Sequence, residues 1–132
     1  MSLRSKNYEI NIKPIPWTRA GLHEKRFFDK QTREKLAYGL ILSKQHGTDP
    51  QFEGPLLIDI QFHMKIPALI KYREKHGYHY HRPDLDNLIK FVLDTINNVG
   101  CIWKDDGQVA QIISQKIFIK EPKLIITISE LT

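Results

Sequence analysis

The sequence predicts a single α+β domain in which two helices cover one face of a mixed four-stranded sheet. The chain has 132 residues, the size of one ordinary domain. Four segments alternate in polarity as strands do, and two show helical periodicity, in the order β-α-β-α-β-β. No repeat, low-complexity tract or linker divides the chain, so residues 1–132 are treated as one unit.

The first half of the chain contains a strand, a helix and a second strand. Residues 8–13 alternate with period two, as a half-buried strand does. A helix is expected to begin at Asp29 or Thr32 and to end at Gly47. Its buried stripe is expected to consist of Leu36, Ala37, Leu40 and Ile41. Residues 57–65 place apolar side chains on one side and predict a strand with one buried face.

The second half contains a helix and two strands. The helix is expected to begin at Asp84, whose side chain can cap it, and to run to about Asn97, before Gly100. Its predicted buried face consists of Leu85, Leu88, Ile89, Val92, Leu93 and Ile96. Residues 108–120 and 124–130 are predicted to pair as a β-hairpin.

The composition fits a polyanion-binding protein of a reducing compartment. Lys and Arg number 20 against 15 Asp and Glu, which gives a formal net charge of +5. The single cysteine, Cys101, excludes an intrachain disulfide. No segment approaches the roughly 20 apolar residues of a transmembrane helix. We therefore expect a cytoplasmic protein that does not enter a membrane.

Acidic residues are concentrated at the start of the second helix and in the turn after it. Asp84 and Asp86 are close enough for their carboxylates to reach one ion, and Lys90 follows one turn later. Asp105 and Asp106 form a second acidic pair, one of which can return to the helix start only if the helix runs antiparallel to the following strand, a geometry that the predicted architecture permits. Carboxylates are ligands of Mg²⁺, which polarises phosphates and activates water. The pattern predicts a Mg²⁺ site for phosphodiester hydrolysis.

The acidic residues allow three other interpretations. An EF-hand requires a ligand and a glycine where this chain has Leu88 and Ile89. The Asp-x-Asp of aspartyl-phosphate phosphatases follows an apolar strand, whereas Asp84 follows a segment of His, Tyr and Arg. In a purely structural interpretation, Asp84 is a helix cap, and Asp86 and Lys90 form a surface ion pair worth about 0.3–0.5 kcal/mol.

Basic residues interleaved with tyrosines precede the acidic helix. Lysine and arginine can neutralise DNA phosphates, and tyrosine can stack on bases exposed at a branch point. The DNA-binding candidates are Lys71, Arg73, Lys75 and Arg82, together with Arg19, Lys25 and Arg26 of an N-terminal arm. An ordinary solvated surface is the alternative interpretation.

Tryptophan and histidine side chains allow more than one role. Trp103 lies in an apolar turn and is expected to pack in the core, whereas Trp17 could pack or stack on a base. His76, His79 and His81 could bind zinc, but no cysteine is close, and contact with phosphate explains the cluster without a second metal.

The acidic motif matches a known pattern. The chain contains Arg82-Pro83-Asp84-Leu85-Asp86-Asn87-Leu88-Ile89-Lys90, then Asp94, Gly100, Trp103 and Asp105-Asp106-Gly107-Gln108-Val109. This pattern resembles the RusA family of phage-derived Holliday junction resolvases. The resemblance implies that Asp84, Asp86 and Asp106 are metal-binding catalytic carboxylates, with Asp105 as the second choice. It also implies that Lys90 is the catalytic lysine.

The same resemblance implies the partners and the reaction. A bacterial or phage-encoded homodimer would use Mg²⁺, or Mn²⁺ in its place, to nick symmetrically related strands of a four-way DNA junction. Two alternatives remain open. The same residues could serve a nuclease for flaps or forks, or the chain could be a non-catalytic module that binds branched DNA.

Overall fold

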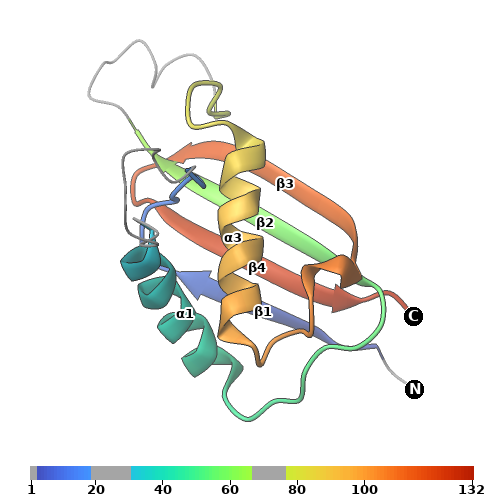
Figure 1. The fold of residues 1–132 in the computed structure, drawn as a ribbon. Helices are drawn as coiled ribbons and strands as arrows, with labels where there is room; N and C mark the ends of the chain where they lie inside the picture. The colour runs from blue at the N-terminus through green and yellow to red at the C-terminus, as the bar shows by residue number, and fades with distance from the viewer. Residues whose placement is uncertain (1–2, 19–30, 67–76) are drawn as a thin grey trace.

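The computed structural model describes residues 3–18, 31–66 and 77–132. Its elements are β1 (Ser5–Ile10), α1 (Thr32–His46), β2 (Leu56–Lys65), α3 (Leu85–Val99), the 3-10 turn η1 (Asp106–Gln108), β3 (Val109–Ile119) and β4 (Lys123–Glu130). Both helices lie on one face of a mixed four-stranded sheet (Figure 1). The predicted fold class and element order are confirmed. Within the described ranges, no helix is long and apolar enough to cross a membrane.

The strand order of the sheet is β1-β4-β2-β3. β2 pairs in parallel with β3 and antiparallel with β4, and β1 completes the sheet antiparallel to β4. The predicted hairpin between the last two strands is therefore wrong, because β2 lies between them. Alternation in a sequence shows which face of a strand is buried, but it does not show which strand lies beside it.

The first strand begins and ends three residues earlier than predicted. β1 runs from Ser5 to Ile10, and its pairing with β4 ends where Ile10 lies opposite Leu124. The polarity pattern continues to Lys13, but no strand within the described ranges pairs with this part of the chain. At the outer edge of β1, the Gln45 side chain accepts a hydrogen bond from Glu9 N at 2.9 Å and donates one to Glu9 O at 2.6 Å. Helix α1 thereby occupies part of an open strand edge.

The core lies between the sheet and α3. The even-numbered residues of β2 from Leu56 to Met64 are buried beneath the helices. Helix α3 buries Leu88, Phe91, Val92, Thr95 and Ile96. Three residues of its predicted apolar face, Leu85, Ile89 and Leu93, are only partly buried. The helix ends at Gly100, whose φ of 80° is a left-handed conformation that glycine adopts without strain.

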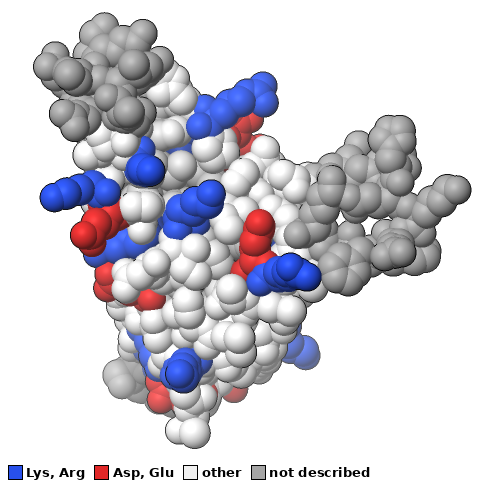
Figure 2. Space-filling model, turned by 90° about the vertical axis from the view of Figure 1, so that its left-hand side faces the viewer, with Lys and Arg blue, Asp and Glu red and all other residues white. Residues whose placement is uncertain are grey.

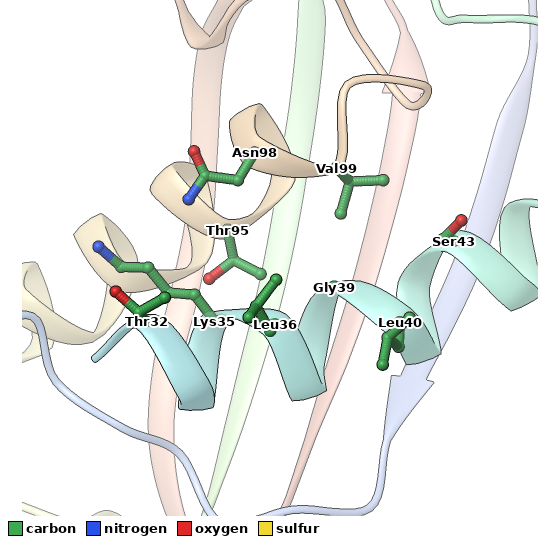
Figure 3. A pocket seen from close by; sticks show the side chains of 9 residues that line it. All are labelled: Thr32, Lys35, Leu36, Gly39, Leu40, Ser43, Thr95, Asn98 and Val99. Carbon is green, nitrogen blue, oxygen red and sulfur yellow. The ribbon is translucent and has the colours of Figure 1, made fainter. Parts of the chain in front are cut away.

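The buried stripe predicted for α1 is wrong. Leu36 and Leu40 are 61% and 71% exposed, Ala37 is exposed and Ile41 is half-buried. The buried residues of α1 are Tyr38, Leu42 and His46. Leu36 and Leu40 instead line an open groove of about 290 Å³ between α1 and the C-terminal end of α3 (Figure 3).

Polar contacts explain why Tyr38 and His46 of α1 can be buried beside Leu42, on the face of the helix opposite the exposed Leu36 and Leu40. Tyr38 packs edge-on against Phe91, with ring centres 5.2 Å apart, and its hydroxyl donates to Lys13 O. The hydroxyl of Tyr8 and His46 Nδ1 share a hydrogen bond of 2.7 Å. These partners satisfy the polar ends of large side chains, so the apolar ring surface can be buried.

Candidate functional site

Two exposed carboxylates stand at the start of α3. Asp84 occupies the position before the first helical residue in an extended conformation, and its main-chain oxygen accepts the first helical hydrogen bond from Leu88 N at 3.2 Å. Its side chain makes no capping hydrogen bond, so the prediction that it caps the helix is wrong. Asp86 lies in the first turn and is also exposed. The Asp84 carboxylate is therefore not used in holding the helix.

Lys90 lies one turn beyond Asp86 and contacts an aromatic ring. Its ammonium nitrogen is 3.7 Å from the centre of the Trp17 ring. Trp17 is itself tied to the helix, because its main-chain N–H donates to Asn87 O at 2.9 Å. No ion pair within 4.0 Å joins Lys90 to Asp86, both of which are described. The chain after β1 thus orients the lysine at the helix start.

The turn that leads into α3 is held by a lysine of β3. Lys116 Nζ donates to His81 O and to Pro83 O, each at 2.7 Å. Burial lowers the pKa of Lys116, and the nearby Asp84 carboxylate acts in the opposite direction. The ammonium of Lys116 is therefore near enough to Asp84 for the two charges to interact.

The second acidic pair divides into two different local roles. The Asp105 side chain accepts a hydrogen bond from Gly107 N at 2.9 Å and caps η1, and the Gln108 side chain accepts from Asp105 N at 3.2 Å. Asp106 is half-buried, and its Oδ2 accepts from Asn97 Nδ2 at 3.1 Å. Asn97 in turn accepts from Trp103 Nε1 at 2.7 Å. Trp103 is buried, as predicted.

The two acidic sites lie at opposite ends of α3. Asp106 contacts Asn97 near the C-terminal end of the helix, whereas Asp86 is in its first turn, about 16 Å away along the helix axis. Figure 1 shows η1 beside the C-terminal half of α3, with β3 running back toward the helix start. The geometry in which one of this pair returns to the helix start is therefore not present within one chain, although β3 does run back toward that end. The described residues contain no group of three acidic, histidine or cysteine side chains that could hold one metal ion.

Comparison with known proteins identifies the family of this chain. Residues 11–129 match the family described as Endodeoxyribonuclease RusA. The chain belongs to the RusA endodeoxyribonuclease family. It is also 29% identical over 103 residues to the uncharacterized protein YqaN of Bacillus subtilis (strain 168), a match covering 72% of this chain and 71% of that protein.

Membership in the RusA family implies a nuclease that acts on branched DNA junctions, and RusA resolvases generally depend on a divalent metal. The exposed acidic residues at the start of α3 are consistent with this chemistry, since carboxylates at a solvent-accessible helix start can bind both a metal ion and its waters.

Most of the DNA-binding candidates of this RusA-family chain lie outside the described residues. These are Lys71, Arg73, Lys75, Arg19, Lys25 and Arg26. Arg82 is described and exposed, two residues before Asp84. On the α1 side, Figure 2 shows Lys and Arg interspersed with Asp and Glu over a largely uncharged surface. Among the coloured residues, this view contains no continuous basic stripe.

The site residues predicted from the sequence did not include Lys116, and two roles, packing and base stacking, were predicted for Trp17. The sequence did contain a signal for Lys116. It lies an even number of residues from Ile112, Ser114 and Phe118 on β3, so the four side chains lie on the same face of the strand. These residues pair with the buried positions Ile58, Ile60, Phe62 and Met64 of β2 and therefore face the helices. A lysine on the core side of a strand needs polar partners. No comparable signal marked Trp17, whose contact joins segments far apart in the sequence.

Proposed function

We propose that this RusA-family protein is a Mg²⁺-dependent endonuclease that resolves Holliday junctions by paired nicks as a homodimer. The observation that carries the proposal is the pair of exposed carboxylates at the start of α3, of which Asp84 leaves its capping position unused. A helix cap contributes about 1 kcal/mol when it is made. An aspartate at this position that does not make the cap has its carboxylate available for a ligand.

Asp84 and Asp86 fit Mg²⁺ as oxygen ligands. Proteins commonly bind Mg²⁺ through one or two carboxylates, with waters and substrate phosphate completing the octahedron. The exposure of both side chains leaves room for these further ligands. When bound, the ion would supply Lewis-acid polarisation of the scissile phosphate and acidify a bound water. Mn²⁺ prefers similar oxygen ligands and is expected to substitute.

Lys90 is proposed to be the catalytic lysine. The indole of Trp17 attracts its ammonium without neutralising it, since a ring face carries no net charge. The aromatic contact therefore holds the lysine one helical turn beyond Asp86 without cancelling its charge. That charge would stabilise the negative charge that develops on the phosphoryl group during hydrolysis.

Asp106 is proposed to act from a second copy of the chain. A two-fold axis beside the middle of α3 would place the helix end of one copy against the helix start of the other. Each of the two resulting sites would contain Asp84 and Asp86 from one copy and Asp106 from the other. Asp105 remains the second choice, because its carboxylate already caps η1. Two identical sites match the two symmetric cuts that a four-way junction requires.

An apolar flank of α3 and β3 is the proposed dimer surface. Ile89, Leu93 and Asn97 follow one another at intervals of four residues, so the two apolar residues lie on the side of α3 that reaches Asp106. Ile112 of β3 faces the same side as the helices and is 44% exposed. We call these three residues, Ile89, Leu93 and Ile112, the α3–β3 flank. The α3–β3 flank lies between the two acidic sites. A two-fold contact that brings Asp106 of one copy to Asp84 and Asp86 of the other would be centred on this surface.

A cleavage assay on defined DNA substrates tests the proposed function. A labelled four-way junction is incubated with the protein and Mg²⁺, Mn²⁺ or a chelator, beside a flap, a fork and a linear duplex of the same sequence. We expect symmetric nicks in the junction with either metal and none with chelator. Preferential cutting of the flap or fork would replace junction resolution with the alternative nuclease activity. Metal-independent binding without nicking of any substrate would refute catalysis.

A further inference from the structure

We infer that Lys116 is a positioning residue that holds the turn presenting Asp84. This inference rests on the proposed function, in which Asp84 binds the metal ion. Lys116 lies on β3, far from the acidic motif in sequence, and its ammonium makes two hydrogen bonds of 2.7 Å, to His81 O and Pro83 O. Pro83 O belongs to the peptide group that joins directly to Asp84. The lysine therefore fixes the main chain immediately before the carboxylate.

The location of Lys116 explains why it can perform this role. It pairs with Phe62, a fully buried residue of the central strand, so its stem rises from the helix-covered face of the sheet. A buried lysine stem gains apolar contact, but its ammonium requires acceptors. The carbonyls of the turn provide them. Charged donors make hydrogen bonds roughly twice as strong as neutral ones, so this contact restrains the turn more than a neutral side chain could.

Its two carbonyl contacts distinguish Lys116 from a residue that binds phosphate. Lysine has three donor hydrogens, and two of them are directed at the main chain of the turn. Arg82, by contrast, is exposed within the same turn. The role of Lys116 is therefore to place Asp84, and its loss is expected to weaken metal binding without weakening DNA binding.

The preceding segment is attached to β3 independently of the ammonium. Phe118 N donates to Gly77 O at 2.8 Å, and His79 N donates to the main-chain oxygen of Lys116 at 2.9 Å. Tyr78 and Ile117 form an antiparallel bridge at the same place. These contacts use main-chain atoms, so they survive a change of the Lys116 side chain. Substitution of Lys116 should release the turn while the segment before it stays docked.

Lys116→Met tests the inference, with Lys123→Met as the matched control. Methionine keeps the apolar stem and removes the donors. Lys123 is also a half-buried strand lysine, but it pairs with Glu9 at 2.8 Å on the face of the sheet opposite the helices. For Lys116→Met we expect the Mn²⁺ concentration that gives half-maximal junction cleavage to rise at least about tenfold. Junction affinity measured in Ca²⁺ should stay within about twofold of the parent. Lys116→Arg, which retains donors, should recover part of the loss.

Hydrogen–deuterium exchange supplies a readout that does not depend on activity. Amides of residues 82–88 should exchange faster in Lys116→Met than in the parent or in Lys123→Met. The amides of His79 and Phe118, which pair the preceding segment with β3, should exchange at the parental rate. Unchanged exchange in this peptide would overturn the inference, as would parental metal dependence or a parallel loss of junction affinity. If the parent itself cuts no substrate, the proposed function fails, and the exchange experiment still decides whether Lys116 holds the turn.

Discussion

The ammonium of Lys90 lies 3.7 Å from the centre of the Trp17 ring, and this contact joins the segment after β1 to the start of α3. The main-chain N–H of Trp17 donates to Asn87 O at 2.9 Å, so the indole is fixed relative to the helix that carries the lysine. A cation over an indole contributes roughly 0.5–2 kcal/mol. The contact therefore restrains the proposed catalytic lysine without cancelling its charge.

Substitution of Trp17 should slow cleavage through Lys90. Trp17→Leu removes the ring and with it an interaction worth about 0.5–2 kcal/mol. If this interaction acts only in the transition state, its loss lowers the single-turnover cleavage rate by about 2–30-fold. Trp17→Phe keeps an aromatic ring that attracts a cation less strongly than indole, so its cleavage rate should lie between those of the parent and Trp17→Leu. Rates are measured at saturating protein on a labelled junction. Parental rates in Trp17→Leu would show that the ring does not orient the lysine for chemistry.

Asp86→Asn should abolish cleavage while junction binding survives. The amide retains the size of the carboxylate but supplies no negative charge to a divalent ion, so a loss of at least about 10³-fold in rate is expected. Asp94→Asn is the matched control on the same helix. Asp94 forms a long ion pair of 3.9 Å with Lys35 of α1 and is not part of the proposed site. Gel-shift binding in Ca²⁺ and cleavage in Mg²⁺ are compared. An Asp86→Asn protein that cuts at the parental rate would refute the metal assignment.

Mixing two inactive variants should restore nicking. If each site combines Asp86 of one copy with Asp106 of the other, a dimer of Asp86→Asn and Asp106→Asn has one doubly altered site and one intact site. Such a dimer should make single nicks in a junction that neither variant cuts alone. The two proteins are mixed, allowed to exchange subunits and assayed with Mg²⁺. Inactivity of mixtures in which subunit exchange has been verified would contradict a site shared between copies.

Charge introduced on the α3–β3 flank should disrupt the proposed dimer. Ile112→Glu places a carboxylate on the helix-facing side of β3, where Ile112 is 44% exposed, so burying it against a second copy becomes unfavourable. Ile113→Glu is the control on the opposite face of the same strand, and Leu40→Glu tests the groove beside α1. Sedimentation velocity should detect monomers only for Ile112→Glu, together with loss of cleavage. A fully dimeric Ile112→Glu protein would exclude this surface.

The stability of the fold should decrease in mild acid because of His79. Burial lowers the pKa of His79 below its ordinary value of 6.5, and the charges of Lys116 and His81 act in the same direction. As pH falls below about 6.5 the unfolded chain binds the proton first, so the free energy of unfolding decreases until the folded protein is protonated as well. Above this range the residue is neutral in both states and contributes no pH dependence.

The measurement for His79 is urea unfolding at pH 7.5 and pH 5.0. His79→Phe removes the titrating group while keeping a ring beside Phe118, whose ring centre lies 4.9 Å away. The difference in unfolding free energy between the two pH values should be smaller in the variant than in the parent. It should not vanish, because burial also lowers the pKa of His63. An unchanged difference would show that His79 does not contribute to the acid sensitivity.

Sequence patterns predicted the fold where local chemistry was sufficient. The alternation of β2 predicted its buried face, and the periodicity of α3 predicted that Leu88, Val92 and Ile96 would be buried. Gly47 and Gly100 marked the ends of both helices. The acidic motif also led directly to the family, because the spacing of its residues can be recognised without any structure.

The sequence alone determined the fold class, the order of elements and the acidic residues proposed for the site. Only the tertiary structure decided which strands are neighbours, which face of α1 is buried and that Asp106 contacts the C-terminal end of α3. These properties depend on contacts between distant segments, such as β2 lying between β3 and β4, or Tyr38 packing on Phe91. Local periodicity contains no information about such partners, because pairing is selected by the packing free energy of the whole domain.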